Sequence, residues 1–240
     1  MSIKVLAMGV HNDDCDYGIG GTAKLLADQG CDVYFSYLMS PYHEALAEYQ
    51  TSDSVRSLGL AGKLHRFIQA KDAILYGEEL VEAYSDIVKE VQPDIAFIMW
   101  PRDNHIEHEH CAKAQLDALY RSAPQVKEVY AYEVGPLQTM AFFGEPDISV
   151  NITDAIEPVK EVLSTFTTSV RGSQALWREK EVSSQWRGHM AYADFDYAEA
   201  LKMIKLPNGG EDFLLRQLLG DRFRWGGVGS YYWGRHYYFQ

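Results

Sequence analysis

The stretch "IKVLAMGVHNDD", residues Ile3–Asp14, decides how this sequence is expected to fold. It starts with a mainly apolar run of strand length, as expected for a strand that is buried on both faces of a sheet. The run passes directly into one histidine and two aspartates, and Gly20 and Gly21 then precede the helical pattern of 22–30. A strand that leads at once into a helix begins a βαβ unit, so parallel strands are predicted.

The first half of the chain continues to alternate between strand and helix patterns. Further strands are predicted at 31–39, 64–68, 94–100 and 128–134, with helices at 45–60, 78–91 and 108–123. This alternation predicts an α/β fold, namely a Rossmann-like, doubly wound, mostly parallel sheet flanked by helices, with strand order 3-2-1-4-5. Beyond Pro136 the pattern weakens. There, 154–166, 196–206 and 212–220 look helical, and the aromatic-rich 224–240 resembles a loop or a sheet edge.

Composition and charge exclude several classes of protein. The 240 residues are 47% hydrophobic and contain no linker, so a single domain over 1–240 is expected, with no role assigned to its C-terminal segment. A formal net charge of −12 argues against a nucleic-acid partner, because phosphate binding needs a basic face. Three cysteines without a CxxC pair indicate a reduced, cytoplasmic protein, and no stretch is long and apolar enough to span a membrane.

Two segments are dense in residues that bind metals. His11–Asp14 follows the first predicted strand, and "WPRDNHIEHEH", residues 100–110, follows the fourth. In the expected order these two strands are neighbours whose connections leave on opposite sides of the sheet, so both segments should reach one crevice. Imidazole and carboxylate suit a divalent first-row metal, and a catalytic zinc takes three protein ligands plus water. We expect His11 and Asp14 as ligands, with Asp13 as the base beside the bound water. The other cluster would add one or more of His105, His108 and His110.

Each segment also has an ordinary structural explanation when it is taken alone. HNDD is typical of a solvated turn, because Asn and Asp bond their own backbone, and the acids of DNHIEHEH suit a helix start. Their pairing at neighbouring strand ends favours a metal site.

The glycines are a weaker signal, since a dinucleotide-binding GxGxxG would need glycine where Ala23 stands, and the acids upstream would repel a pyrophosphate. We therefore expect Gly18, Gly20 and Gly21 to serve turns and close approaches.

Together the two segments resemble the motifs of the PIG-L/LmbE family of metal-dependent N-deacetylases, which act on N-acetylglucosamine conjugates and related amides. The first family motif, H-P-D-D-x-E followed by G-G-T, stands here at 11–16 and 20–22. The second, D-x-H-x-D-H, stands at 103–108. "VYAYEVGPLQT" and "SQWRGHMAYADFDYAEAL" resemble later blocks of the family, so the likeness covers roughly residues 1–205.

The resemblance implies a role for each residue of the two motifs. His11, Asp14 and His108 would hold the metal, which is Zn²⁺ with Fe²⁺ as the alternative. Asp13 would be the general base that activates the metal-bound water. His105 would lie near the substrate carbonyl, where it stabilises the developing oxyanion or protonates the leaving amine.

Three matched positions depart from the family pattern. Asn12 replaces the motif proline, which should loosen the loop, and Asp16 replaces a glutamate in a supporting position. Glu107 replaces an aspartate that would orient the proposed acid, and Asp103, which matches the motif, is expected to support the ligands from behind in the same way as Asp16 and Glu107. None of these departures removes a ligand or the base, so an active enzyme is expected.

Arg187, in a later block, is a candidate for binding a substrate hydroxyl, phosphate or carboxylate, with a surface salt bridge as the alternative.

The expected reaction is hydrolysis of an N-acetyl or similar N-acyl group from an amino sugar or its conjugate. Two other classes stay open. One is an Fe(II) oxygenase, since two histidines and one carboxylate also compose its ligand set, and the other is a non-catalytic α/β binding protein with a degenerate site. The expected partner is a small N-acylated substrate, and the family resemblance and the aromatic tail are compatible with a homo-oligomer.

Overall fold

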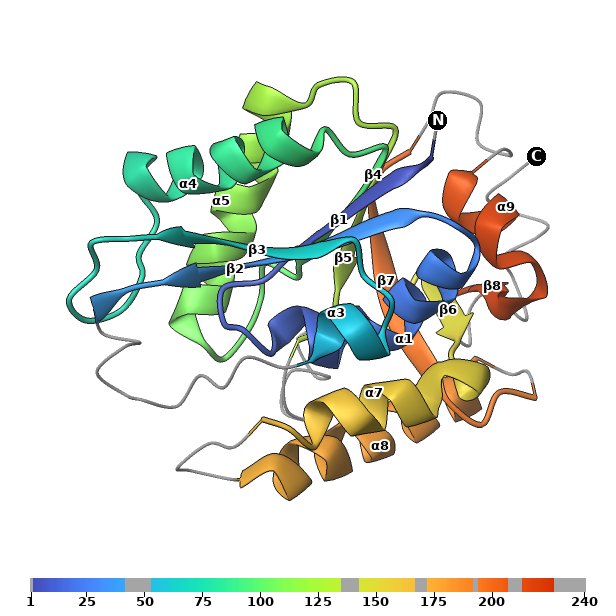
Figure 1. Cartoon of the computed structure of the whole chain (residues 1–240). Helices are drawn as coiled ribbons and strands as arrows, with labels where there is room; N and C mark the ends of the chain where they lie inside the picture. Colours follow the sequence, from blue (N-terminus) through green and yellow to red (C-terminus); the bar gives the residue numbers. More distant parts are fainter. Residues whose placement is uncertain are drawn as a thin grey trace.

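The computed structural model describes residues 2–41, 53–134, 143–166, 172–191, 194–206 and 213–226. Its centre is an eight-stranded sheet of order β3-β2-β1-β4-β5-β7-β6-β8 (Figure 1). Five neighbouring strands are parallel: β1 (Lys4–Met8), β2 (Asp32–Met39), β3 (Gly62–Phe67), β4 (Ile95–Met99) and β5 (Glu128–Tyr132). Three antiparallel strands extend the sheet: β6 (Ile148–Asn151), β7 (Ala198–Lys205) and β8 (Phe223–Trp225). The predicted α/β class and the 3-2-1-4-5 order are confirmed.

Helices cover both faces of the sheet (Figure 1). One face carries α4 (Glu78–Val91) and α5 (Ile106–Ser122), which pack on each other. The other carries α1 (Asp14–Asp28), α3 (Ser54–Ser57), α7 (Ile156–Leu163) and α8 (Gly172–Met190). The short α9 (Leu214–Leu219) contacts α1 and β8, and single 3₁₀ turns cover Thr153–Ala155 and Gly220–Arg222. Every residue of β4 and β5 is buried, as expected for strands covered on both faces.

Helix α1 consists of two segments that meet at a kink. The kink is at Ile19, whose φ and ψ of −135° and 21° are not helical. The amides of Gly21 and Thr22 both donate to the carboxylate of Glu199 on β7, at 3.0 and 2.7 Å. A carboxylate at this point caps the otherwise unpaired amides that begin the second segment. Buried Lys180 on α8 balances the charge of Glu199 at 2.8 Å. The helix start predicted near Thr22 is therefore the start of this second segment.

Two glycines of α1 allow close packing beneath the site. A Cβ at Gly18 would lie 2.2 Å from the ring of Tyr132, and one at Gly21 would lie 2.7 Å from Ile152. Both distances are shorter than van der Waals contact, so no larger residue fits without movement. A Cβ at Gly20 would meet its nearest neighbour at an ordinary 3.4 Å. The expectation of close approach is met at Gly18 and Gly21 and not at Gly20.

The helix predicted over 196–206 is wrong, because this segment forms β7. Its sequence, rich in Ala, Glu, Leu and Lys, has helix-forming residues, but β7 pairs with β5 on one side and β6 on the other. Tertiary pairing between two strands outweighs that local preference.

Other predictions are met in part or lie outside the described residues. The predicted helices 154–166 and 212–220 contain α7 and α9. The segment 224–240 is predicted as a loop or a sheet edge, and its first residues, 224 and 225, belong to the edge strand β8. Residues 45–52 of the predicted helix 45–60 and the aromatic end from 227 lie outside the described residues. Over the described chain, no helix combines the length and the apolar character needed to cross a bilayer.

Candidate metal centre

The first set of candidate ligands lies in the tight loop that joins β1 to α1. Asp14, the first residue of α1, is buried and accepts hydrogen bonds at Oδ2 from the amides of Val10 and His11, at 2.8 and 2.7 Å. These two bonds close the loop and fix the Asp14 side chain. Its other oxygen, Oδ1, lies 3.6 Å from Nδ1 of His11. The HNDD segment, which in sequence is typical of a solvated turn, thus forms a loop whose backbone amides bind the buried carboxylate of Asp14.

The second set lies where the loop after β4 enters α5. His105 is the residue before the helix, and His108 is buried in its first turn. Asp103 ties the two together, because its Oδ1 accepts the amide of His105 at 2.9 Å and its Oδ2 lies 2.9 Å from Nδ1 of His108. The carboxylate favours a proton on Nδ1 of His108, which leaves the lone pair of Nε2 facing the first loop.

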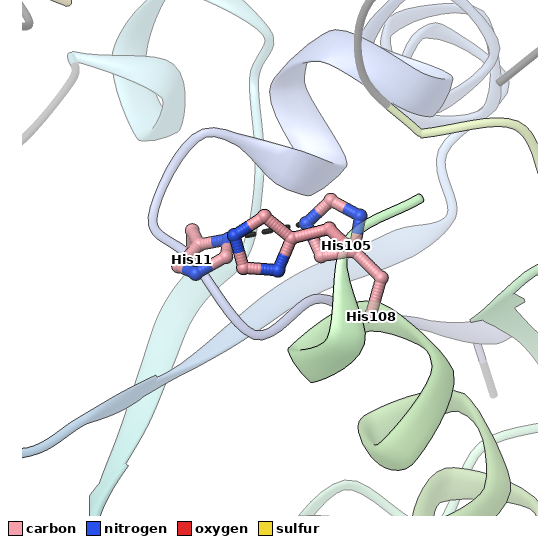
Figure 2. A group of neighbouring side chains, drawn as sticks. All are labelled: His11, His105 and His108. Atoms are coloured by element: carbon pink, nitrogen blue, oxygen red, sulfur yellow. Dashed lines mark hydrogen bonds between the residues drawn. The ribbon is translucent and has the colours of Figure 1, made fainter. Parts of the chain in front are cut away.

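Three ligand atoms from the two loops converge on one point. His11 Nδ1 and His108 Nε2 are 3.2 Å apart, and Asp14 Oδ1 lies 3.6 and 3.4 Å from them. Figure 2 shows the two rings approaching each other, one from the loop after β1 and one from α5. Atoms bound to a tetrahedral ion at 2.0–2.1 Å are separated by about 3.4 Å. The spacing and the chemistry of these three atoms therefore fit a divalent metal ion.

Glu107 is placed differently from what the resemblance implies. It is expected to orient and tune His105, and its charge does oppose the lowering of the His105 pKa. Its hydrogen-bonding contacts include other groups, since Oε2 lies 2.9 Å from Nε2 of His11 and Oε1 accepts the amide of Ile74 at 2.6 Å. The carboxylate thereby favours a proton on Nε2 of His11 and leaves Nδ1 facing His108 and Asp14. Each of the two candidate histidine ligands is thus held from behind by a carboxylate.

Charges reinforce one another among the three converging side chains. Burial alone would lower the pKa of His108, but the carboxylates of Asp14 and Asp103 raise it to about 9. Burial alone would also lower the pKa of His11, but the carboxylates of Asp14 and Glu107 hold this pKa well above its ordinary value. Burial would raise the pKa of Asp14, and the two imidazoles instead lower it well below its usual range. The protein alone therefore retains positive charge at the point where a metal cation would replace the protons.

Asp13 and His105 flank this triad. A carboxylate oxygen of Asp13 lies within 4.8 Å of ligand atoms of His11 and Asp14, and a ring nitrogen of His105 lies within the same distance of His11 and His108. Burial and the neighbouring Asp14 raise the pKa of Asp13. Burial and the charges of His108 and His11 lower the pKa of His105 to about 4. His105 is exposed and its ring stacks on His108, with centroids 4.6 Å apart (Figure 2). His105 with His11 and His108, and Asp13 with His11 and Asp14, thus also form groups whose ligand atoms could hold a metal ion.

Two further residues that the sequence singles out are bound within the protein. Asp16 is buried and lies 2.7 Å from the ammonium of Lys63 on β3. Arg187 on α8 is also buried, and it binds the carboxylate of Glu133 through Nε at 3.0 Å and Nη2 at 2.9 Å. It also donates to the carbonyl of Gly144. The alternative of a surface salt bridge is wrong for Arg187, because the pair is internal.

Lys63 and Glu133 are the residues that sequence reasoning missed. Glu133 directly follows β5, at the same edge of the sheet as the two ligand loops, and that position is a signal that could have found it. Lys63 directly precedes the predicted strand 64–68 and lies outside both motifs, so the sequence carries no signal for its partner.

The chain is similar in sequence to a known family and to one of its curated relatives. A family model described as PIG-L, GlcNAc-PI de-N-acetylase, matches residues 6–119, which include both ligand loops. Diacetylchitobiose deacetylase from Thermococcus kodakarensis is 26% identical over 175 residues, 64% of this chain and 65% of that relative. The chain thus covers slightly less than two thirds of that relative's length.

Two solved structures share the fold. The 4-carboxy-2-hydroxymuconate hydratase from Pseudomonas putida has a TM-score of 0.66 and 18% identity, over 88% of this chain and 99% of its own. The N,N'-diacetylchitobiose deacetylase from Pyrococcus horikoshii, in complex with an inhibitor, has a TM-score of 0.63 and 17% identity, over 84% and 83%. Enzymes with different reactions in their names share this fold, so the fold alone does not decide the reaction.

Proposed function

Because residues 6–119 form a PIG-L family domain, we propose that this protein is a metal-dependent hydrolase that removes an N-acetyl group from an amino sugar or its conjugate. The observation that carries the proposal is the triangle of His11 Nδ1, Asp14 Oδ1 and His108 Nε2, with separations of 3.2–3.6 Å. The proposal extends to the whole of 1–240 as one domain.

The chemistry of an amide explains why such a centre is needed. The amide carbonyl is a poor electrophile, and the amine leaves only after it gains a proton. A bound divalent ion would supply Lewis acidity to the carbonyl and to the attacking water. Asp13, whose carboxylate lies beside the triad, is proposed to take the proton of that water. His105, exposed next to His108, has a pKa lowered to about 4 and is proposed to donate a hydrogen bond from its neutral ring to the carbonyl oxygen. The proton that Asp13 takes from the water is then available to the leaving amine.

Zinc is the metal we propose, with Fe²⁺ as the alternative. Two imidazoles and one carboxylate bind either ion. The three atoms lie 3.2–3.6 Å from one another, which supports a divalent first-row ion bound by all three.

The substrate class follows from the relatives. Two proteins of similar sequence or fold are named diacetylchitobiose deacetylases, which supports an N-acetylated amino sugar as substrate. Substrate binding by Arg187 stays a proposal that rests on the family resemblance, since in the structure its Nε and Nη2 bind Glu133. The three cysteines are free and buried, which is compatible with the proposed cytoplasmic location.

Acetate release tests the proposed reaction. The zinc-loaded protein, incubated with N,N'-diacetylchitobiose and N-acetylglucosamine, should release acetate and an equal amount of primary amine. Asp13→Asn should bind zinc as the wild type does and lose most of this activity, by a factor of about 10²–10⁴. Bound zinc without acetate release from a panel of N-acetylated amino sugars would refute the proposal. Oxygen consumption by the iron-loaded protein with a 2-oxo acid would establish the oxygenase instead. Failure to bind either metal would favour the non-catalytic binding protein.

A further inference from the structure

Lys63 on β3 lies buried beside the loop that carries the candidate ligands. Its ammonium donates to the carbonyl oxygen of Asn12 at 2.7 Å, to Oδ2 of Asp16 at 2.7 Å and to the hydroxyl of Ser54 at 3.2 Å. The side chain is 7% exposed. Three oxygens from three different elements thus meet at one nitrogen.

The contact with Asn12 is the one that bears on the metal centre. Asn12 lies between His11 and Asp13, and its carbonyl belongs to the rigid peptide plane that leads into Asp13. Holding this oxygen fixes the peptide plane between residues 12 and 13, and with it the direction in which the chain leaves residue 12 and enters Asp13. A proline would restrict φ of residue 12 covalently, but asparagine does not. In this chain a hydrogen bond from Lys63, on β3, restrains the carbonyl of the same residue.

The remaining contacts keep the ammonium in place. A buried ammonium is costly unless it is paired, and the carboxylate of Asp16, on the first turn of α1, supplies the counter-charge. The rings of Tyr37 and Phe166 lie 5.8 and 5.5 Å from the nitrogen, within the range of a cation–π contact. Lys63 has charged, polar and aromatic neighbours, so its position beside Asn12 is well determined.

We infer that Lys63 is a positioning residue of the metal centre, which holds the Asn12 carbonyl so that the neighbouring His11, Asp13 and Asp14 keep their geometry. The inference rests on the proposed function, in which this loop binds the metal. Lys63 itself does not touch the metal or the substrate. Its loss should therefore weaken metal binding and loosen the loop even where the fold survives.

The chain offers a matched control in Lys180. This second buried lysine also neutralises a carboxylate that contacts α1, since it lies 2.8 Å from Glu199, which caps Gly21 and Thr22. Its side chain is 4% exposed, similar to that of Lys63. Lys180 thus supports the second segment of α1, whereas Lys63 holds the loop before the first.

The test compares two variants in which both charges of a buried pair are removed. Lys63→Met/Asp16→Asn and Lys180→Met/Glu199→Gln are measured for zinc affinity by competition with a chelator, and for stability by urea unfolding. The Lys63 variant should bind zinc about 10–100-fold more weakly than the wild type. The Lys180 variant should lose stability while its zinc dissociation constant stays within about twofold. Equal zinc affinity in the folded Lys63 variant and the wild type would overturn the inference.

Hydrogen exchange of the metal-free protein gives a second readout that does not depend on metal or activity. Peptides that span residues 9–17 should exchange faster in the Lys63 variant and at the wild-type rate in the Lys180 variant. Unchanged exchange would also overturn the inference. Hydrogen exchange therefore tests the role of Lys63 separately from the proposed reaction, because the measurement can be made even if the protein releases no acetate or binds no zinc.

A milder variant covers the case in which the Lys63 double variant does not fold. Lys63→Arg keeps the charge beside Asp16, but the longer, planar guanidinium cannot place a nitrogen where the ammonium donates to Asn12. It should fold, bind zinc about 3–10-fold more weakly and show faster exchange in residues 9–17. Wild-type affinity and exchange in this variant would overturn the inference.

Discussion

Replacing Glu107 by glutamine should weaken metal binding by changing the tautomer of His11. The carboxylate of Glu107 now faces two N–H groups, at Nε2 of His11 and at the amide of Ile74. A glutamine has one acceptor oxygen, and the shorter contact, 2.6 Å to Ile74, is the one we expect it to keep. Its NH₂ group would then face His11 and favour a proton on Nδ1, the atom that points at His108 and Asp14.

The size of the effect follows from the lost hydrogen bond. A hydrogen bond to a charged group contributes about 1.5–3 kcal/mol, and this amount now favours the tautomer of His11 that can bind a metal. Its loss corresponds to about 10–100-fold in the zinc dissociation constant. The assay is a zinc titration against a chelator of known affinity, together with ¹⁵N chemical shifts of the His11 ring in the metal-free protein at alkaline pH, where the ring has lost its second proton and the shifts report the tautomer directly.

Glu79→Gln provides the control for this substitution. Glu79 also accepts a backbone amide, that of Gln69 at 3.0 Å, and lies outside the two ligand loops. It should bind zinc as the wild type does. A folded Glu107→Gln protein with wild-type zinc affinity and an unchanged His11 tautomer would refute the reasoning.

Three further predictions follow from the same geometry. His105→Ala should lower kcat by about 10²–10⁴-fold and leave the zinc affinity within about twofold, because His105 flanks the triad; a large loss of zinc binding would make it a ligand. Gly18→Ala should destabilise the protein by about 1–3 kcal/mol in urea unfolding, since its Cβ would lie 2.2 Å from Tyr132, whereas Gly20→Ala, with 3.4 Å of space, should change stability far less. The pKa of His108 is raised from 6.5 to about 9, so its protonated ring stabilises the folded metal-free protein. This stabilisation should be complete below about pH 6.5 and should be lost as the pH rises through about 9. Zinc should bind more tightly over the same rise, and pH-independent stability of the metal-free protein would contradict this charge arrangement.

The position of the candidate site could be predicted because it depends on topology. Apolar runs and turn residues give the parallel strands, and their order brings the ends of β1 and β4 together. The convergence of His11 and His108, which are 97 residues apart, follows from that order and needs no knowledge of side-chain contacts. The same local patterns predict α4 at its observed bounds, Glu78–Val91.

What could not be predicted depends on contacts between distant segments. The segment at β7 has helix-forming residues, and only its pairing with β5 and β6 makes it a strand. Glu107 could reach either of two histidines, and the folded loop decides for His11. Lys63 is one charged residue in a strand, and its contact with Asn12 exists only after β3 has packed beside β2.

The central claim is that one metal ion is bound by both loops, and anomalous diffraction at the zinc edge from crystals of the zinc-loaded protein tests it most directly. We predict a single strong peak about 2.0–2.2 Å from His11 Nδ1, Asp14 Oδ1 and His108 Nε2. A peak bound by His105 with Asp14 excluded, or no peak between the two loops, would contradict the account.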